Sequence, residues 1–228
     1  MRLKRMMQGA GFVYVLLLLG AVCPSLFTIG KQAEGEAPGT AYANASAYVA
    51  DSIMEKPKIA ITFDDGPSAV YTPRLLDGLK ERGVKATFFL IGQNIEKEGG
   101  SEIVKRMYEE GHLIGNHTYH HVEITKVSND ENITGEEVQF MRPPFGLWQK
   151  ELEKKIHVLP VMWSIDPLDW ATENVDEIVN KVVTEAQEND IILLHDCYDS
   201  SVKAALRIID LLQAEGYEFV TVDELMLD

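Results

Sequence analysis

Alternating strand and helix patterns constrain the fold of this chain more than any other feature. From residue 58 onward, short runs rich in β-branched and aromatic residues alternate with longer segments whose apolar residues recur every three or four positions. Within residues 174–188, for example, Val175, Ile178, Val179 and Val182 form one apolar stripe. Strands that alternate with amphipathic helices imply a parallel sheet, either open or closed as a barrel.

This pattern predicts seven strands, at residues 58–63, 86–91, 112–116, 138–142, 157–163, 190–195 and 217–221. It predicts five helices, at residues 72–82, 101–110, 147–155, 174–188 and 200–215. Seven strands are one fewer than a regular α/β barrel has, so any barrel would be imperfect. The connection from residue 122 to 139 carries no amphipathic helix and is short and polar for a parallel crossover.

The first 30 residues have the pattern of a targeting segment. Arg2, Lys4 and Arg5 precede an apolar run from about residue 9 to 29. Because this run is about long enough to cross a bilayer, we favour an uncleaved membrane anchor over a cleaved signal peptide. The excess of basic residues before the run would keep the N-terminus in the cytoplasm and export the rest. We therefore expect an anchor or signal peptide at 1–30, a linker at 31–57 and a folded, extracytoplasmic domain at 58–228.

Composition limits the partners of that domain. The chain has 36 acidic and 21 basic residues, for a formal net charge of −15. Such a surface argues against nucleic acid, because phosphate binding needs cationic faces. The two cysteines, Cys23 and Cys197, lie in different segments, and a disulfide between them is not expected. No protein partner is implied.

Two adjacent carboxylates end the first predicted strand. Asp64 and Asp65 follow the apolar run 59–63, and Gly66-Pro67 forces a turn after them. The carboxyl ends of parallel strands are where α/β proteins place their chemistry. This composition is also ordinary for a polar turn, so on this stretch alone a turn and a site are about equally supported.

Three of the six histidines of the chain follow the third strand, as His117, His120 and His121. His117 and His121 are four residues apart and can face the same way. With Asp64 or Asp65 as a third ligand, they would make a hydrolytic zinc site or a non-haem iron site. His120 could replace either histidine in that set.

Three further strand ends carry polar or aromatic groups. Arg142 ends the fourth strand, Asp166, Asp169 and Trp170 follow the fifth, and His195 ends the sixth. Each could be structural by itself, as a solvated Arg or a core histidine. Five strands with ionisable groups at the same end are nevertheless more consistent with one shared site than with five unrelated loops.

Five short segments, taken together, resemble the motifs of a known family. TFDDGPS, HTYHH, RPPFG, DPLDW and LLH occur in this order and are similar to the motifs of polysaccharide deacetylases of carbohydrate esterase family 4. The resemblance covers about residues 58–226. It implies an α/β fold with a distorted (β/α) barrel of about seven parallel strands.

The resemblance also implies roles for individual residues. The metal ligands would be Asp65, His117 and His121, and the cofactor a divalent metal, most simply zinc. The remaining roles would be a base (Asp64), an arginine that holds it (Arg142), an acid (His195), an aspartate that orients the acid (Asp169), and two residues bordering a pocket for the acetyl methyl group (Trp170 and Leu193). The backbone N–H of Phe145 would stabilise the oxyanion. Phe145 stands where the family often has Tyr.

The implied activity is removal of acetyl groups from N-acetylglucosamine units of a cell-envelope polysaccharide, similar to peptidoglycan or chitin. Two alternatives stay open. One is an O-acetyl xylan esterase or a deacetylase of another hexosamine polymer. The other is an inactive carbohydrate-binding domain, because the segment 122–141 looks shorter than in the family.

Overall fold

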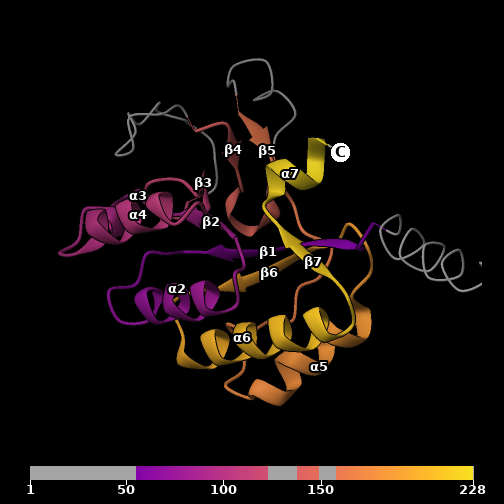
Figure 1. Cartoon of the computed structure of the whole chain (residues 1–228). Coiled ribbons are helices and arrows are strands. Elements are labelled where there is room, and N and C mark those ends of the chain that lie inside the picture. The colour runs from indigo at the N-terminus through magenta and orange to yellow at the C-terminus, as the bar shows by residue number, and fades with distance from the viewer. Residues whose placement is uncertain (1–54, 123–137, 149–157, 228) are drawn as a thin grey trace, which may run out of the picture. The chain divides into compact units, whose positions relative to one another are not determined.

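One parallel sheet organises the structure, a computed structural model that describes residues 55–122, 138–148 and 158–227. All strand pairs are parallel, in the order β5-β4-β3-β2-β1-β6, and β7 pairs with β1 (Figure 1). The strands are β1 (Lys58–Asp64), β2 (Thr87–Leu90), β3 (Leu113–Asn116), β4 (Phe140–Met141), β5 (Leu159–Pro160), β6 (Ile191–His195) and β7 (Glu218–Val220). Each of them overlaps a segment that the sequence predicts as a strand.

Four of the five predicted helices are confirmed with shifted ends: α2 (Thr72–Glu81), α4 (Gly100–Glu109), α5 (Val175–Glu185) and α6 (Asp199–Ala214). Most of the remaining predicted helix, at 147–155, lies outside the described residues, as does most of the polar connection 122–139. Three short helices of the described part were not predicted: α3 (Gly92–Ile95), the 3₁₀ turn η1 (Pro144–Gly146) and α7 (Val222–Leu227).

Strand β1 is the centre of the sheet. It pairs with β2 and β6 along its C-terminal half and with β7 at its start. The register sets Asp64 opposite Phe89 of β2 and His195 of β6. Two of the candidate polar groups therefore lie level with each other at the carboxyl end of the sheet.

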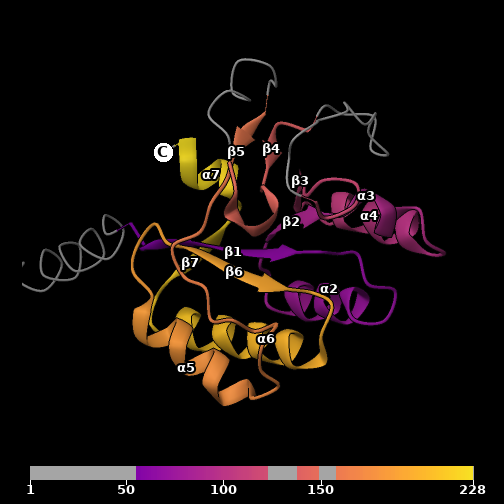
Figure 2. The same cartoon turned by 180° about the vertical axis from the view of Figure 1, so that it is seen from behind.

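The two faces of the sheet have different surroundings. On one face Ile59, Ile61 and Phe63 pack with the buried residues of α2, α4, α5 and α6, which cover that side (Figures 1 and 2). On the other face a smaller apolar cluster contains Ala60 and Phe89. Because strand residues alternate between faces, Thr62 and Asp64 point to this second side.

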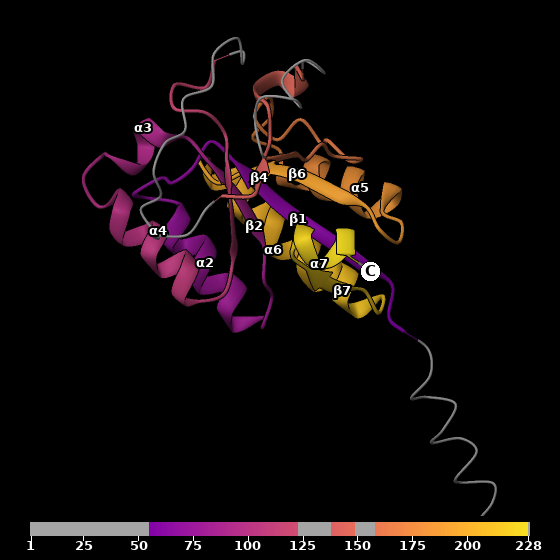
Figure 3. The same ribbon diagram turned by 90° about the horizontal axis from the view of Figure 1, so that it is seen from above.

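The sheet is a half-barrel rather than a closed barrel. Within the described residues β5 and β6 are its two ends. The chain leaving β5 crosses to β6, where Ile165 forms a single bridge with Ile192 (Figure 3 views the sheet from above). The predicted α/β fold with parallel strands is thus confirmed, and its barrel is open.

None of the helices that the structure describes is long and apolar enough to cross a membrane. The expected anchor at 1–30 and almost all of the expected linker at 31–57 lie outside the described residues.

Candidate active site

Asp64 and Asp65 leave β1 in different directions. Asp64, the last residue of the strand, is 3% exposed and faces the interior of the half-barrel. Asp65 has a left-handed backbone conformation with φ of 72°. A left-handed residue directly after a strand breaks the alternation of side chains. The two carboxylates therefore contact different neighbours.

Arg142 is the neighbour of Asp64. Its guanidinium is fully buried and donates a 2.8 Å hydrogen bond from Nη1 to Oδ1 of Asp64. Nη1 also lies 2.6 Å from the Thr62 hydroxyl, and Nε and Nη2 donate to the backbone carbonyls of Val161 and Met162. A buried charge is tolerated only when it is paired and hydrogen-bonded in this way.

Asp65 lies beside two histidines. Its Oδ1 is 3.4 Å from Nε2 of His117 and 3.4 Å from Nε2 of His121. One potential ligand atom from each of these three residues lies within 4.8 Å of the others. His120 points elsewhere, with Nδ1 3.1 Å from the side-chain oxygen of Gln93.

The hydrogen bonds around this trio fit a cation. Nδ1 of His117 lies 2.8 Å from the carbonyl oxygen of Arg142, which can only accept, so Nδ1 carries the proton. In this tautomer the Nε2 lone pair of His117 faces Asp65, whose Oδ1 is buried and has no hydrogen-bond partner among the described residues. Lone pairs of a carboxylate and two imidazoles that converge on one point are the donor set of a divalent metal.

Burial and charge act in opposite directions on these groups. Burial alone would raise the pKa of Asp65, but its contact with His117 and the nearby His195 and His121 outweigh burial and lower that pKa. For His121, burial outweighs the attraction of Asp65 and lowers the pKa. Both shifts favour the forms that bind metal, a carboxylate and a neutral imidazole.

The short helix α3 ties the two loops of this trio together. Asn94 donates from Nδ2 to the backbone oxygen of Asp65 at 2.6 Å. The backbone N–H groups of Gly92 and Gln93 donate to the carbonyls of Thr118 and Tyr119, each at 3.0 Å. The loops from β1 and β3 are therefore braced by the same four residues, which the sequence did not reveal as a helix.

His195 is held by Asp169. Nδ1 of His195 lies 2.8 Å from Oδ1 of Asp169, and the backbone N–H of His195 donates to Oδ2 at 2.9 Å. Burial alone would lower the pKa of His195, but the bond to Asp169 outweighs it and raises the pKa to about 8. Nε2 of His195 points toward Asp65, 3.9 Å from its Oδ2.

Asp196 is a further buried carboxyl that the sequence did not single out. It is fully buried, accepts a hydrogen bond from the Thr72 hydroxyl, and presses against Gly66, where an added Cβ would lie 2.5 Å from its oxygens. Burial raises the pKa of Asp196 to about 7. Only glycine fits at position 66, so the turn after Asp65 is fixed by this contact.

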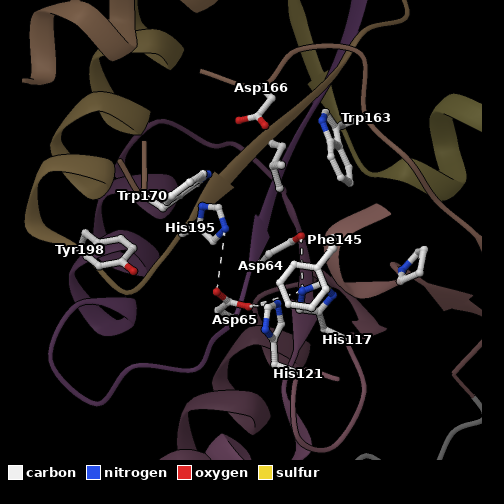
Figure 4. Close-up of a pocket in the computed structure, with 12 residues that line it drawn as sticks. Asp64, Asp65, His117, His121, Phe145, Trp163, Asp166, Trp170, His195 and Tyr198 are labelled. Atoms are coloured by element: carbon white, nitrogen blue, oxygen red, sulfur yellow. Dashed lines mark ion pairs between the residues drawn. The ribbon is translucent and has the colours of Figure 1, made fainter. Parts of the chain in front are cut away.

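These groups open on one cavity of about 410 Å³ (Figure 4). It is lined by Asp64, Asp65, His117, His121, Pro143, Phe145, Trp163, Asp166, Trp170, Leu193, His195 and Tyr198. Phe145, with φ of 59°, lays its ring 4.8 Å from that of His121. Eight of the ten predicted site residues line the cavity, and the other two, Arg142 and Asp169, contact Asp64 and His195 from behind it. Pro143, Trp163 and Tyr198 were not among the predicted site residues.

The sequence profile of the family described as "Polysaccharide deacetylase" matches residues 51–162. The chain is 38% identical over 181 residues to the peptidoglycan-N-acetylglucosamine deacetylase PgdA of Listeria monocytogenes, covering 74% of this chain and 38% of that protein. It is 35% identical over 231 residues to a peptidoglycan-N-acetylglucosamine deacetylase of Bacillus cereus, covering 92% of this chain and 83% of that one.

The fold is similar to that of solved relatives as well. The structure of the peptidoglycan deacetylase PdaC from Bacillus subtilis superposes with a TM-score of 0.70 at 35% sequence identity. The match covers 75% of this chain and 91% of that structure. This chain thus spans well under half of the Listeria protein, and most of the B. cereus protein.

Proposed function

The chain belongs to the polysaccharide deacetylase family, and on this premise we propose that it removes acetyl groups from N-acetylglucosamine units of a cell-wall polysaccharide. One observation carries the proposal. A carboxylate with two histidines, a carboxylate paired with a buried arginine, and a histidine paired with an aspartate all face one cavity. A metal that activates water, a base that takes its proton and an acid that protonates the leaving nitrogen are together sufficient for hydrolysis of an amide.

Asp65, His117 and His121 would hold the metal, most simply zinc. When bound, it would polarise the acetyl carbonyl and lower the pKa of water. The convergent lone pairs on Asp65 and His117 support this assignment. His120, turned toward Gln93, is left out of the ligand set.

Asp64 would take the proton from the attacking water. Its Oδ1 is occupied by Arg142, so Oδ2, which lies 3.7 Å from Nε2 of His117, is the oxygen that remains for the proton. Because Arg142 holds the carboxylate in one orientation, the base is positioned before the substrate arrives.

His195 would give its proton to the nitrogen as the C–N bond breaks, because an unprotonated amine is a poor leaving group. Asp169 fixes Nδ1 of His195, so the acidic proton sits on Nε2, which faces the cavity. The products are acetate and a free amino sugar. The backbone N–H of Phe145 would stabilise the oxyanion, and Leu193 with Trp170 would border the acetyl methyl group.

We place the enzyme outside the cytoplasm, where cell-wall polymers are found, and keep residues 1–30 as the proposed anchor or signal peptide. The domain proper would be 58–228, after a linker at 31–57. Similarity to cell-wall deacetylases supports the location.

Acetate release from several acetylated polymers tests this proposal. Peptidoglycan, N-acetylglucosamine oligomers and acetylated xylan are each incubated with the purified chain, first stripped of metal and then supplied with zinc. We expect zinc-dependent release from the first two. Release from xylan alone would point to an O-acetyl esterase, and no release from any polymer would point to a carbohydrate-binding domain without turnover.

A further inference from the structure

Tyr198 is a cavity residue that the proposed chemistry does not use. It lies three residues after His195, on the connection between β6 and α6. Its ring centroid is 6.4 Å from that of His195, and 43% of the residue is exposed. Figure 4 shows Tyr198 and Trp170 on the same side of the cavity as His195, with Phe145 across from them.

Both aromatic residues carry a hydrogen-bond donor on the ring. Within the part of the chain that the structure describes, neither the Tyr198 hydroxyl nor the Trp170 indole N–H makes a hydrogen bond. Trp170 is 57% exposed. An exposed aromatic group with an unused donor, placed at the mouth of a pocket, is typical of a binding surface rather than of a core.

The backbone at Tyr198 is anchored on both sides in the sequence. Asp196, two residues earlier, is fully buried, and the backbone N–H of Val202 in α6 donates to the carbonyl of Tyr198 at 3.2 Å. Because the backbone at this position is already ordered, only side-chain freedom is lost when a ligand packs on the ring.

The chemistry of the reaction places sugar on this side of the cavity. If His195 protonates the departing nitrogen, the sugar ring that keeps this nitrogen lies next to His195. A cavity of about 410 Å³ suits one acetylated sugar, so the next unit of a polymer lies on the rim. Tyr198 and Trp170 are both exposed beside His195, and Tyr198 is the one of the two to which the proposed chemistry assigns no role.

Resting on the proposed function, we propose that Tyr198 is a sugar-binding residue that packs against the unit next to the reacting one in a β-linked hexosamine polymer. A β-linked pyranose presents a face of C–H groups bordered by hydroxyls. The Tyr198 ring matches that face, and its hydroxyl matches the border. Tyr198 therefore makes the enzyme prefer oligomers to single sugars.

The test compares Tyr198→Ala and Tyr198→Phe with wild type on N-acetylglucosamine and its tetramer. Tyr198→Ala is expected to raise KM for the tetramer roughly 3- to 10-fold and to leave kcat/KM for the monomer unchanged. Tyr198→Phe keeps the ring and should lie within about 2-fold of wild type. Tyr108→Ala, an exposed tyrosine on α4, is the matched control and should change neither substrate.

Equal losses on monomer and tetramer would overturn the proposal, because they would mean that Tyr198 only supports His195. An unchanged KM for the tetramer would overturn it as well. If wild type releases no acetate at all, the proposed function fails separately. Calorimetric titration of the tetramer into wild type and into Tyr198→Ala then tests the sugar contact. Weaker binding by Tyr198→Ala supports it, whereas equal affinities, or no binding by wild type, contradict it.

Discussion

The guanidinium of Arg142 lies 2.8 Å from the carboxylate of Asp64, although 78 residues separate them in the chain. Arg142 reaches it through the interior of the half-barrel, with its guanidinium 4.3 Å from the centre of the Phe89 ring. A base that is both buried and ionised needs such a partner. We therefore expect the stability of the domain and the position of the proposed base, Asp64, to depend on the same contact.

Arg142→Met is expected to lower the free energy of unfolding by about 3–5 kcal/mol, because it leaves the Asp64 carboxylate buried without its charge partner. Urea denaturation measures the change. Arg74→Met is the matched control, since Arg74 pairs with Asp199 at an exposed site and should cost at most about 1 kcal/mol. Equal losses of unfolding free energy from the two substitutions would show that the buried pair stabilises the domain no more than an exposed pair does.

The Asp169–His195 pair predicts how activity depends on pH. Since Asp169 raises the pKa of His195 to about 8, the acid is protonated below that pH and acetate release should fall as pH rises through it. Asp169→Asn removes the negative charge, lowers the pKa of His195 and should move the falling limb of kcat to lower pH. A limb that stays in place in Asp169→Asn would contradict the role of His195 as the acid.

Replacing the histidines one at a time separates the ligands from their neighbour. His117→Ala and His121→Ala are expected to lose bound zinc, whereas His120→Ala should retain it, because His120 contacts Gln93 instead. The zinc content of each desalted protein gives the answer. Loss of zinc from His120→Ala alone would show that the wrong pair has been assigned.

Helix α3 leads to a prediction about metal affinity. Asn94→Ala removes the 2.6 Å hydrogen bond to the backbone of Asp65 and should weaken zinc binding roughly 10- to 100-fold. Lys97→Ala, which removes only an exposed contact to the Asn94 side chain, should leave binding unchanged. Competition with a chelator measures both, and identical affinities would mean that α3 does not position Asp65.

The sequence indicates the strands well, and the apolar runs in it end directly at Asp64 and His195, the proposed base and acid. It does not indicate α3, since four residues that include Gly92 are too few for a helical period to be visible. Tyr198 likewise has no motif or period of its own. Tyr198 reaches the cavity because β6 pairs with β1, and this long-range pairing cannot be read from the local sequence.

The different neighbours of Asp64 and Asp65 are likewise not predictable from the local sequence. In the sequence they are neighbouring and chemically equivalent. In the structure the left-handed backbone at Asp65 turns it toward His117 and His121, while Asp64 stays in the strand beside Arg142. The resemblance to a family implied different roles for the two residues, and the backbone conformation at Asp65 is the reason that their neighbours differ.

The most direct measurement is the rate of acetate release from the N-acetylglucosamine tetramer by wild type and Asp64→Asn, both loaded with one equivalent of zinc. The substituted amide keeps the shape of the side chain but cannot accept the proton, so we expect the rate to fall roughly 10²- to 10⁴-fold while the zinc is retained. A variant that releases acetate as fast as wild type would contradict Asp64 as the base and, with it, the proposed mechanism.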